Sequence, residues 1–222
     1  MRRLIPKYAY IPFALWFIML GVCFYLTRLF NTNWHHYDLS IPLDGKIPFV
    51  PAMIVVYIFS YVIWAVGTIM ISHESADLCY EIMSAHVIAK LFATVIFLAV
   101  PTTMVRAEVT GSDIFSQLTR LIYKLDTPDN LFPSLHCLEN WIICRGFLKC
   151  KHLKIGWKIG SFVAALAVFA SVVTVRQHLF LDIPAGILVG ELGLQLSARL
   201  KAGNILKKMN KKYGLHPEQT IV

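Results

Sequence analysis

Two histidines of this chain, His136 and His178, stand where a long apolar segment meets a polar turn. Ionisable groups at such positions are costly to bury and are functional candidates by default. His136 follows Pro133 and Ser134 in the stretch FPSLHCLEN. Ser134 can cap a helix, which places His136 in its first turn, in a recess below the outer surface. A neutral imidazole can attack phosphorus, and a second can protonate the leaving oxygen and later deprotonate water.

Charged residues accompany the two histidines. Arg176 and Asp182 flank His178 in the stretch VRQHLFLD, and Arg106 stands at the outer end of another apolar segment. A carboxylate four residues from an imidazole can fix the tautomer of the ring. The planar fork of arginine matches phosphate oxygens and can hold a phosphoryl group without a metal ion. The acidic residues on the outer side have no two-metal spacing, so we expect neither a metal nor another cofactor.

The segments that must position these residues are long enough to cross a membrane. The chain is 57% hydrophobic and 15% charged, whereas a soluble domain carries about 25% charged residues. About twenty apolar residues span the hydrocarbon core as a helix. Six segments qualify, of which the fourth is the shortest: 8–30, 49–71, 85–105, 135–147, 155–175 and 183–200. We therefore expect an all-α fold, a polytopic bundle of six transmembrane helices in a single membrane domain, residues 1–222.

Basic residues mark one side of the predicted bundle. They precede the first segment, cluster between the fourth and the fifth, and follow the sixth. Because basic residues stay on the cytoplasmic side, both termini should be cytoplasmic and the histidines should face outward. The loop 72–84 should also be cytoplasmic, although it is acidic and lacks Lys and Arg. The net charge of +8 comes from these clusters, so we expect anionic membrane lipids as partners and no nucleic acid.

The longest outward segment, 106–133, contains a further predicted helix between the third and fourth spans. Apolar residues recur at helical spacing in 112–126, polar residues lie elsewhere on the wheel, and Ser112 or Asp113 can cap its start. This pattern is typical of a short amphipathic helix lying in the membrane interface. A helix packed over the mouth of the bundle fits the pattern equally well.

Other ionisable residues in the apolar segments are expected to be structural. Glu139 lies three residues after His136 and could bond to it or to Arg145, and His86 should reach toward the membrane surface. Glu191 needs a partner or a wet cavity, and the sequence indicates none. The spacing of the five cysteines fits neither a disulfide framework nor a zinc site.

Residues 85–200 resemble the membrane-bound type 2 phosphatidic acid phosphatase superfamily. The second signature of that family, Pro-Ser-Gly-His, is similar to residues 133–136, where Leu135 replaces the glycine. The third signature is Ser-Arg, five residues, His, three residues and Asp. It is matched by Ser171, His178 and Asp182, with Val172 at the arginine position and Arg176 one helical turn later.

The first signature, Lys, six residues and Arg-Pro, is matched only at Arg106, because Ala99 and Ala107 stand in place of the lysine and proline. These departures resemble the branch that contains bacterial members and the inositol-phosphoceramide synthases. The absent lysine removes one phosphate contact. The branch implies a bacterial plasma membrane and includes phosphotransferases as well as phosphatases.

The resemblance implies a metal-independent hydrolase of phosphoric monoesters or diphosphates at the outer leaflet. His178 would be the nucleophile that becomes phosphorylated, Asp182 would orient it, and His136 would act first as acid and then as base. The phosphate would be bound by three residues: Arg106, Arg176 and Ser134. Candidate substrates are phosphatidic acid, phosphatidylglycerol phosphate and isoprenoid diphosphates.

Three alternatives remain open at this point. The same phosphoenzyme could pass its phosphoryl group to an alcohol, which would make the chain a lipid head-group phosphotransferase. A non-enzymatic phospholipid binder or transporter would use the arginines and have no need of His178. A His-liganded metal enzyme needs three or more converging histidines, and only two are expected to converge. The sequence leaves the lipid and the oligomeric state undetermined.

Overall fold

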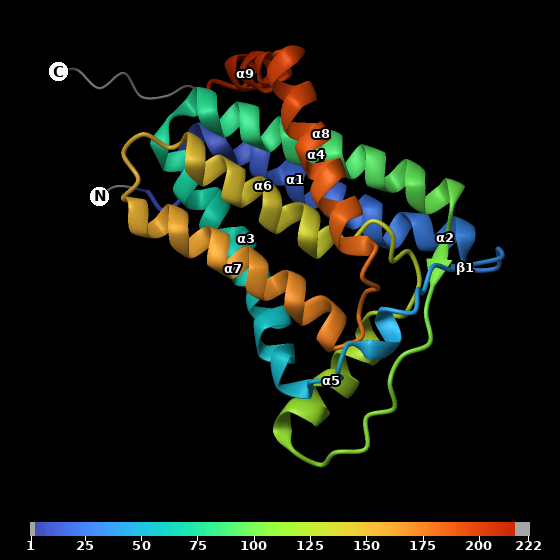
Figure 1. Cartoon of the computed structure of the whole chain (residues 1–222). Helices are drawn as coiled ribbons and strands as arrows, with labels where there is room; N and C mark the ends of the chain where they lie inside the picture. The colour runs from blue at the N-terminus through green and yellow to red at the C-terminus, as the bar shows by residue number, and fades with distance from the viewer. Residues whose placement is uncertain (1–2, 216–222) are drawn as a thin grey trace.

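A computed structural model describes residues 3–215, and over this range the chain folds into a helical bundle (Figure 1). The helices are α1 (Tyr10–Gly21), α2 (Thr27–Asn31), α3 (Ile54–Glu74), α4 (Ala76–Ala99), α5 (Ile114–Leu125), α6 (Leu135–Lys149), α7 (Ile155–Thr174), α8 (Asp182–Arg199) and α9 (Gly203–Lys212). A π-helical turn, η2 (Val22–Leu26), joins α1 to α2. Two short strands, β1 (Tyr37–Asp38) and β2 (Thr102–Thr103), pair in parallel. The predicted all-α class is confirmed.

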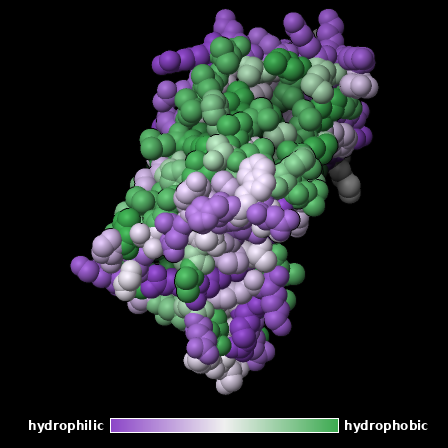
Figure 2. All heavy atoms as spheres, turned by 90° about the vertical axis from the view of Figure 1, so that its right-hand side faces the viewer, coloured by the Kyte–Doolittle hydropathy of each residue, from purple (hydrophilic) through white to green (hydrophobic). Residues whose placement is uncertain are grey.

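Four helical segments of the described chain are long and apolar enough to cross a membrane: Lys7–Asn31, Pro51–Glu74, Ala76–Ala99 and Ile155–Thr174. They correspond to the first, second, third and fifth predicted segments. In the face seen in Figure 2, hydrophobic side chains form a broad band in the upper half below a hydrophilic upper rim, and hydrophilic side chains are frequent in the lower half. This distribution is the one expected of a protein embedded in a membrane.

The predicted fourth and sixth segments form α6 and α8, which are shorter helices. α6 has 15 residues and packs against α3, α4, α7 and α8. Because neighbouring helices surround it, α6 can carry polar residues such as Glu139 and Asn140 in buried positions. The helix that holds His136 therefore lies in the interior of the bundle.

The prediction that residues 72–84 form a loop is wrong. α3 continues to Glu74 and α4 begins at Ala76, so that Ser75 alone separates the two helices. The Ser75 hydroxyl accepts a hydrogen bond from the backbone N–H of Leu78 at 3.1 Å, which caps α4. At its other end α4 stops at Ala99, because the proline at position 101 disfavours helical backbone at the residue before it.

Acidic residues around this tight turn contact residues of the α6–α7 turn and of α9. The Glu74 carboxylate lies 2.9 Å from Nδ1 of His152, and the Asp77 carboxylate lies 2.9 Å from Nζ of Lys207. Glu81 pairs with Lys149. The α3–α4 turn, the α6–α7 turn and α9 therefore lie at one end of the bundle, opposite α5 (Figure 1).

The start of α8 packs directly on the start of α6 through Gly186. A Cβ atom at position 186 would lie 2.6 Å from the carbonyl oxygen of Ser134 and 2.9 Å from Cβ of Cys137. The backbone N–H of Ser134 also donates to the carbonyl of Asp182 at 3.2 Å. This close approach holds two of the predicted catalytic elements together.

Substitution of Gly186 by alanine is expected to lower the free energy of unfolding by about 1–3 kcal/mol, the usual cost of overpacking against backbone. The matched control is Gly160→Ala on α7, where an added Cβ would meet no atom within 4 Å. Thermal unfolding of both variants in detergent measures the difference. Equal melting temperatures for the two variants would contradict the close packing of α6 and α8.

Candidate active site

A cavity of about 430 Å³ lies beside both predicted histidines, a volume in the range of small-molecule sites. Its walls are mostly aromatic and aliphatic, and several polar side chains join them. The lining residues are Phe17, Leu20, Gly21, Phe24, Tyr25, Tyr61, Trp64, Asp126, Asp129, Asn130, Leu131, Leu135, His136, Gln177 and His178. An apolar cavity with a few polar groups suits a ligand that is part hydrocarbon and part charged.

His178 is held in one tautomer by its neighbours. Its Nδ1 lies 3.1 Å from the carbonyl oxygen of Leu131 and 3.0 Å from Oδ2 of Asp182. Both of these atoms only accept hydrogen bonds, so Nδ1 must carry the proton. The neutral ring therefore has its lone pair on Nε2. The Asp182 carboxylate is fixed in turn by the backbone N–H of Leu179 at 2.9 Å.

His136 lies next to His178, with ring centroids 6.1 Å apart. Its Nδ1 is 2.9 Å from Oγ of Ser60, and that oxygen lies 2.6 Å from the carbonyl of Tyr57. The single hydroxyl proton of Ser60 goes to this carbonyl, so Ser60 accepts from Nδ1–H of His136. The nitrogen Nε2 of His136 lies 3.5 Å from the Tyr61 hydroxyl and remains available for proton transfer.

Three aromatic rings of α3 surround the His136 imidazole. The ring centroids of Tyr57, Tyr61 and Trp64 lie 4.2, 5.2 and 5.0 Å from that of His136. The close packing of these rings fixes the position of the imidazole beside His178.

Arg106 follows β2 in a segment without regular secondary structure and not at the end of a membrane helix, because α4 ends at Ala99. Its Nη1 donates to the carbonyl of Asp126 at 2.5 Å, and its Nη2 donates to Oε1 of Gln177 at 2.5 Å. The guanidinium also stacks over the Tyr123 ring at 4.5 Å. Burial lowers the pKa of Arg106, which nevertheless stays charged at neutral pH. Arg106 thus contacts two residues that line the cavity.

Burial also raises the pKa of Tyr123 to about 12, so this residue keeps its phenolic proton. The hydroxyl donates to the carbonyl of Val175 at 2.7 Å. Tyr123 therefore connects α5 to the turn that follows α7, while its ring supports Arg106.

Arg176 is not brought to the histidines, contrary to the prediction. Its guanidinium donates to the carbonyl oxygens of Asp44 at 2.6 Å and Ile47 at 2.7 Å, in the loop before α3. The prediction assumed that the helix continued past position 176. α7 instead ends at Thr174, and Arg176 has a φ of 54°, in the left-handed region that terminates helices. Its side chain consequently points to a different loop.

Ser134 caps α6, as predicted. Its hydroxyl accepts from the backbone N–H of Cys137 at 3.3 Å, and the side chain is fully buried. It fixes the first turn of the helix that carries His136. The structure thus gives Ser134 a contact with α6 rather than a place in the cavity lining.

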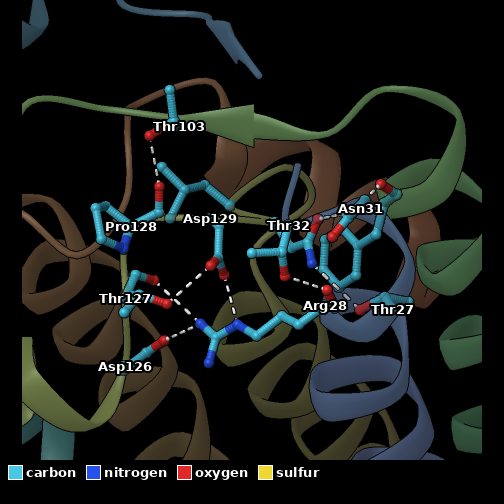
Figure 3. A network of polar contacts seen from close by, with 12 residues as sticks. Thr27, Arg28, Asn31, Thr32, Thr103, Asp126, Thr127, Pro128 and Asp129 are labelled. Carbon is cyan, nitrogen blue, oxygen red and sulfur yellow. Dashed lines mark hydrogen bonds and ion pairs between the residues drawn. The ribbon is translucent and has the colours of Figure 1, made fainter. Parts of the chain in front are cut away.

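Arg28 is a cation of this site that the sequence interpretation missed (Figure 3). Its Nε lies 2.5 Å from Oδ1 of Asp129, its Nη2 lies 3.0 Å from Oδ1 of Asp126, and its Cζ lies 4.0 Å from the Phe24 ring centroid. All three partners line the cavity. The sequence contained a signal for this residue, because Arg28 is the sole charged residue in the apolar segment 8–30. The adjacent π-helical turn is a feature often found at functional sites.

Buried charges away from the cavity are paired. The carboxylate of Glu139 contacts Lys90 and lies 3.0 Å from Nδ1 of His86, and all three side chains are fully buried. The prediction that His86 reaches the membrane surface is wrong, because this carboxylate holds it in the core. Glu191, which is partly exposed, also has a partner, Nε of Arg145 at 3.1 Å. Such pairing makes buried charge tolerable.

Within residues 3–215 the structure brings together no group of three or more His, Cys, Asp and Glu side chains that could hold a metal ion. Comparison of the chain with protein-family models, with curated proteins and with solved structures found no match. The paired histidines, with Asp182 behind one of them, are therefore the strongest indication of chemistry in the described chain.

Proposed function

We propose that the chain is an integral-membrane lipid phosphate or diphosphate phosphatase that works without a metal ion, through a phosphohistidine intermediate. The observation that carries the proposal is the tautomer of His178: Nδ1–H is bonded to Asp182 and Leu131, which leaves Nε2 as a nucleophile. A second imidazole lies beside it in the same cavity. The aromatic and aliphatic walls suit the hydrocarbon part of a lipid.

The reaction proceeds in two displacements at phosphorus. In the first, Nε2 of His178 forms a bond to phosphorus while the bond from phosphorus to the lipid oxygen breaks, and His136 gives its proton to that oxygen. Asp182 stabilises the positive charge that develops on the His178 ring. In the second, His136 removes a proton from water, the water oxygen attacks phosphorus, and the N–P bond breaks to release phosphate.

The membrane arrangement belongs to the same proposal. α6 and α8 would complete six spans, with the end that carries the basic clusters and both termini in the cytoplasm and the cavity facing outward across a plasma membrane. The ion pairs between the α3–α4 turn and the basic clusters support this orientation, because they gather the basic residues at one end. The exposed apolar side chains of α5, Ile114, Leu121 and Leu125, suit a place at the outer interface.

A second candidate function is transfer of the phosphoryl group to an alcohol. The carboxylates of Asp126 and Asp129 line the cavity, and carboxylate oxygens can accept hydrogen bonds from the hydroxyl groups of a sugar or an inositol. Mass spectrometry of products formed with added alcohols separates the two functions. A new phosphate monoester of the added alcohol would favour transfer, and free phosphate alone would favour hydrolysis.

The proposal predicts phosphate release that resists chelation. Purified protein in detergent is incubated with phosphatidic acid, phosphatidylglycerol phosphate or an isoprenoid diphosphate, with and without EDTA. At least one substrate should release inorganic phosphate at a rate that EDTA leaves unchanged. Loss of the activity with EDTA would reject the metal-free mechanism, and release from none of the three substrates would reject the hydrolase.

A further inference from the structure

Gln177 is placed beside the proposed nucleophile by the turn that ends α7. The backbone N–H groups of Gln177 and His178 both donate to the carbonyl of Val172 at 3.0 Å, and Arg176 supplies the left-handed residue that this turn needs. The Gln177 side chain lines the cavity and is only 1% exposed. Its amide is therefore fixed at the wall next to His178.

The orientation of the Gln177 amide follows from its partner. Arginine has only donors, so the atom 2.5 Å from Nη2 of Arg106 must be the amide oxygen Oε1. The opposite end is the NH₂ group. This Nε2 atom is buried and has no hydrogen-bond partner among residues 3–215. A buried donor left without an acceptor is costly, which points to an acceptor supplied by a ligand.

We propose that Gln177 is a catalytic residue that donates a hydrogen bond from Nε2 to an oxygen of the transferring phosphoryl group. Phosphoryl oxygens are acceptors, and they gain charge as the group passes between the nucleophile and the leaving oxygen. The charge of Arg106 polarises the amide through Oε1, so Arg106 acts on the phosphoryl group through Gln177. This role rests on the proposed phosphotransfer at His178.

The decisive variant is Gln177→Glu, which keeps an oxygen for Arg106 and removes the N–H donors. Its kcat on the lipid phosphate is expected to fall about 10- to 100-fold, the usual effect of a hydrogen bond to a charged group, with a smaller change in KM. As the pH falls and the new carboxyl gains a proton, it becomes a neutral donor again. The ratio of variant to wild-type kcat should therefore rise toward acidic pH.

Two further variants separate this role from simple anchoring of Arg106. Gln177→Met removes both ends of the amide and should lose as much kcat as Gln177→Glu. Anchoring alone would instead leave the glutamate variant active, because a carboxylate also binds Arg106. Gln117→Glu is the matched control, since the amide of Gln117 is on α5 and bonds only locally, to the carbonyl of Ser112 at 2.8 Å. It should behave as wild type.

Titration calorimetry with orthovanadate, which mimics the phosphoryl group in transfer, tests Gln177 independently of turnover. Gln177→Glu and Gln177→Met should both bind it about tenfold or more weakly than wild type. If lipids release no phosphate but this weakening is seen, the hydrolase proposal fails and the role of Gln177 as an oxyanion ligand stands. If wild type releases phosphate and both variants match Gln117→Glu, Gln177 is not a catalytic residue. Absence of orthovanadate binding to wild type would also overturn it.

Discussion

Replacement of His178 by asparagine is expected to abolish phosphate release, with kcat lower by about 10⁴-fold or more, the scale seen when a nucleophile is removed. The asparagine amide nitrogen can take the place of Nδ1 and keep the bonds that this atom makes to Leu131 and Asp182. Only Nε2 is lost. The variant should therefore remain folded and lose the atom that forms the bond to phosphorus.

The phosphohistidine intermediate can be measured directly by its ³²P label. Wild-type protein mixed with a ³²P-labelled lipid phosphate and quenched at alkaline pH should carry label in an acid-labile, alkali-stable form, and His178→Asn should carry none. His152→Asn is the control, because His152 is an exposed histidine at the opposite end of the bundle, paired with Glu74. Label retained by His178→Asn, or turnover near the wild-type rate, would remove His178 from the role of nucleophile.

The predictions from sequence that agree with the structure depend on short-range patterns. Apolar length alone predicted the helices that became α3, α4 and α7, because a membrane-spanning helix needs about twenty such residues wherever it lies in the fold. The contact of His178 with Asp182 follows from a four-residue separation, and it holds although His178 precedes α8. Local spacing was sufficient because a tight turn, like a helix, brings such residues together.

The interpretations that failed needed information from distant parts of the chain. Arg176 was expected on the face that holds His178, but the end of α7 at Thr174 redirects its side chain to Asp44, 132 residues earlier. Arg28 meets Asp126 and Asp129 across about a hundred residues, and no spacing rule connects them. The positions of charged groups around the cavity are therefore set by tertiary packing, which cannot be predicted from the spacing of residues along the sequence.

The role of His136 can be isolated from that of His178 by the choice of leaving group. A lipid alkoxide needs a proton to depart, so His136→Asn should lower kcat on a lipid phosphate by about 10²- to 10⁴-fold. Asparagine preserves the bond to Ser60 that Nδ1 of His136 now makes. p-Nitrophenyl phosphate has a leaving group that departs without a proton, so the first displacement should remain fast in the variant.

The second displacement still needs a base to activate water, and His136→Asn lacks it. With p-nitrophenyl phosphate the variant should therefore release about one equivalent of p-nitrophenol per chain in a burst and then turn over slowly, while the phosphoenzyme at His178 accumulates. Stopped-flow absorbance measures the burst, and the ³²P assay measures the trapped intermediate. Steady turnover at the wild-type rate without a burst would show that another group activates water, and loss of both phases would show that the first displacement needs His136 for more than the proton it gives. Accumulation of label in His136→Asn, and its absence in the double variant with His178→Asn, would assign the two imidazoles to separate steps of one reaction.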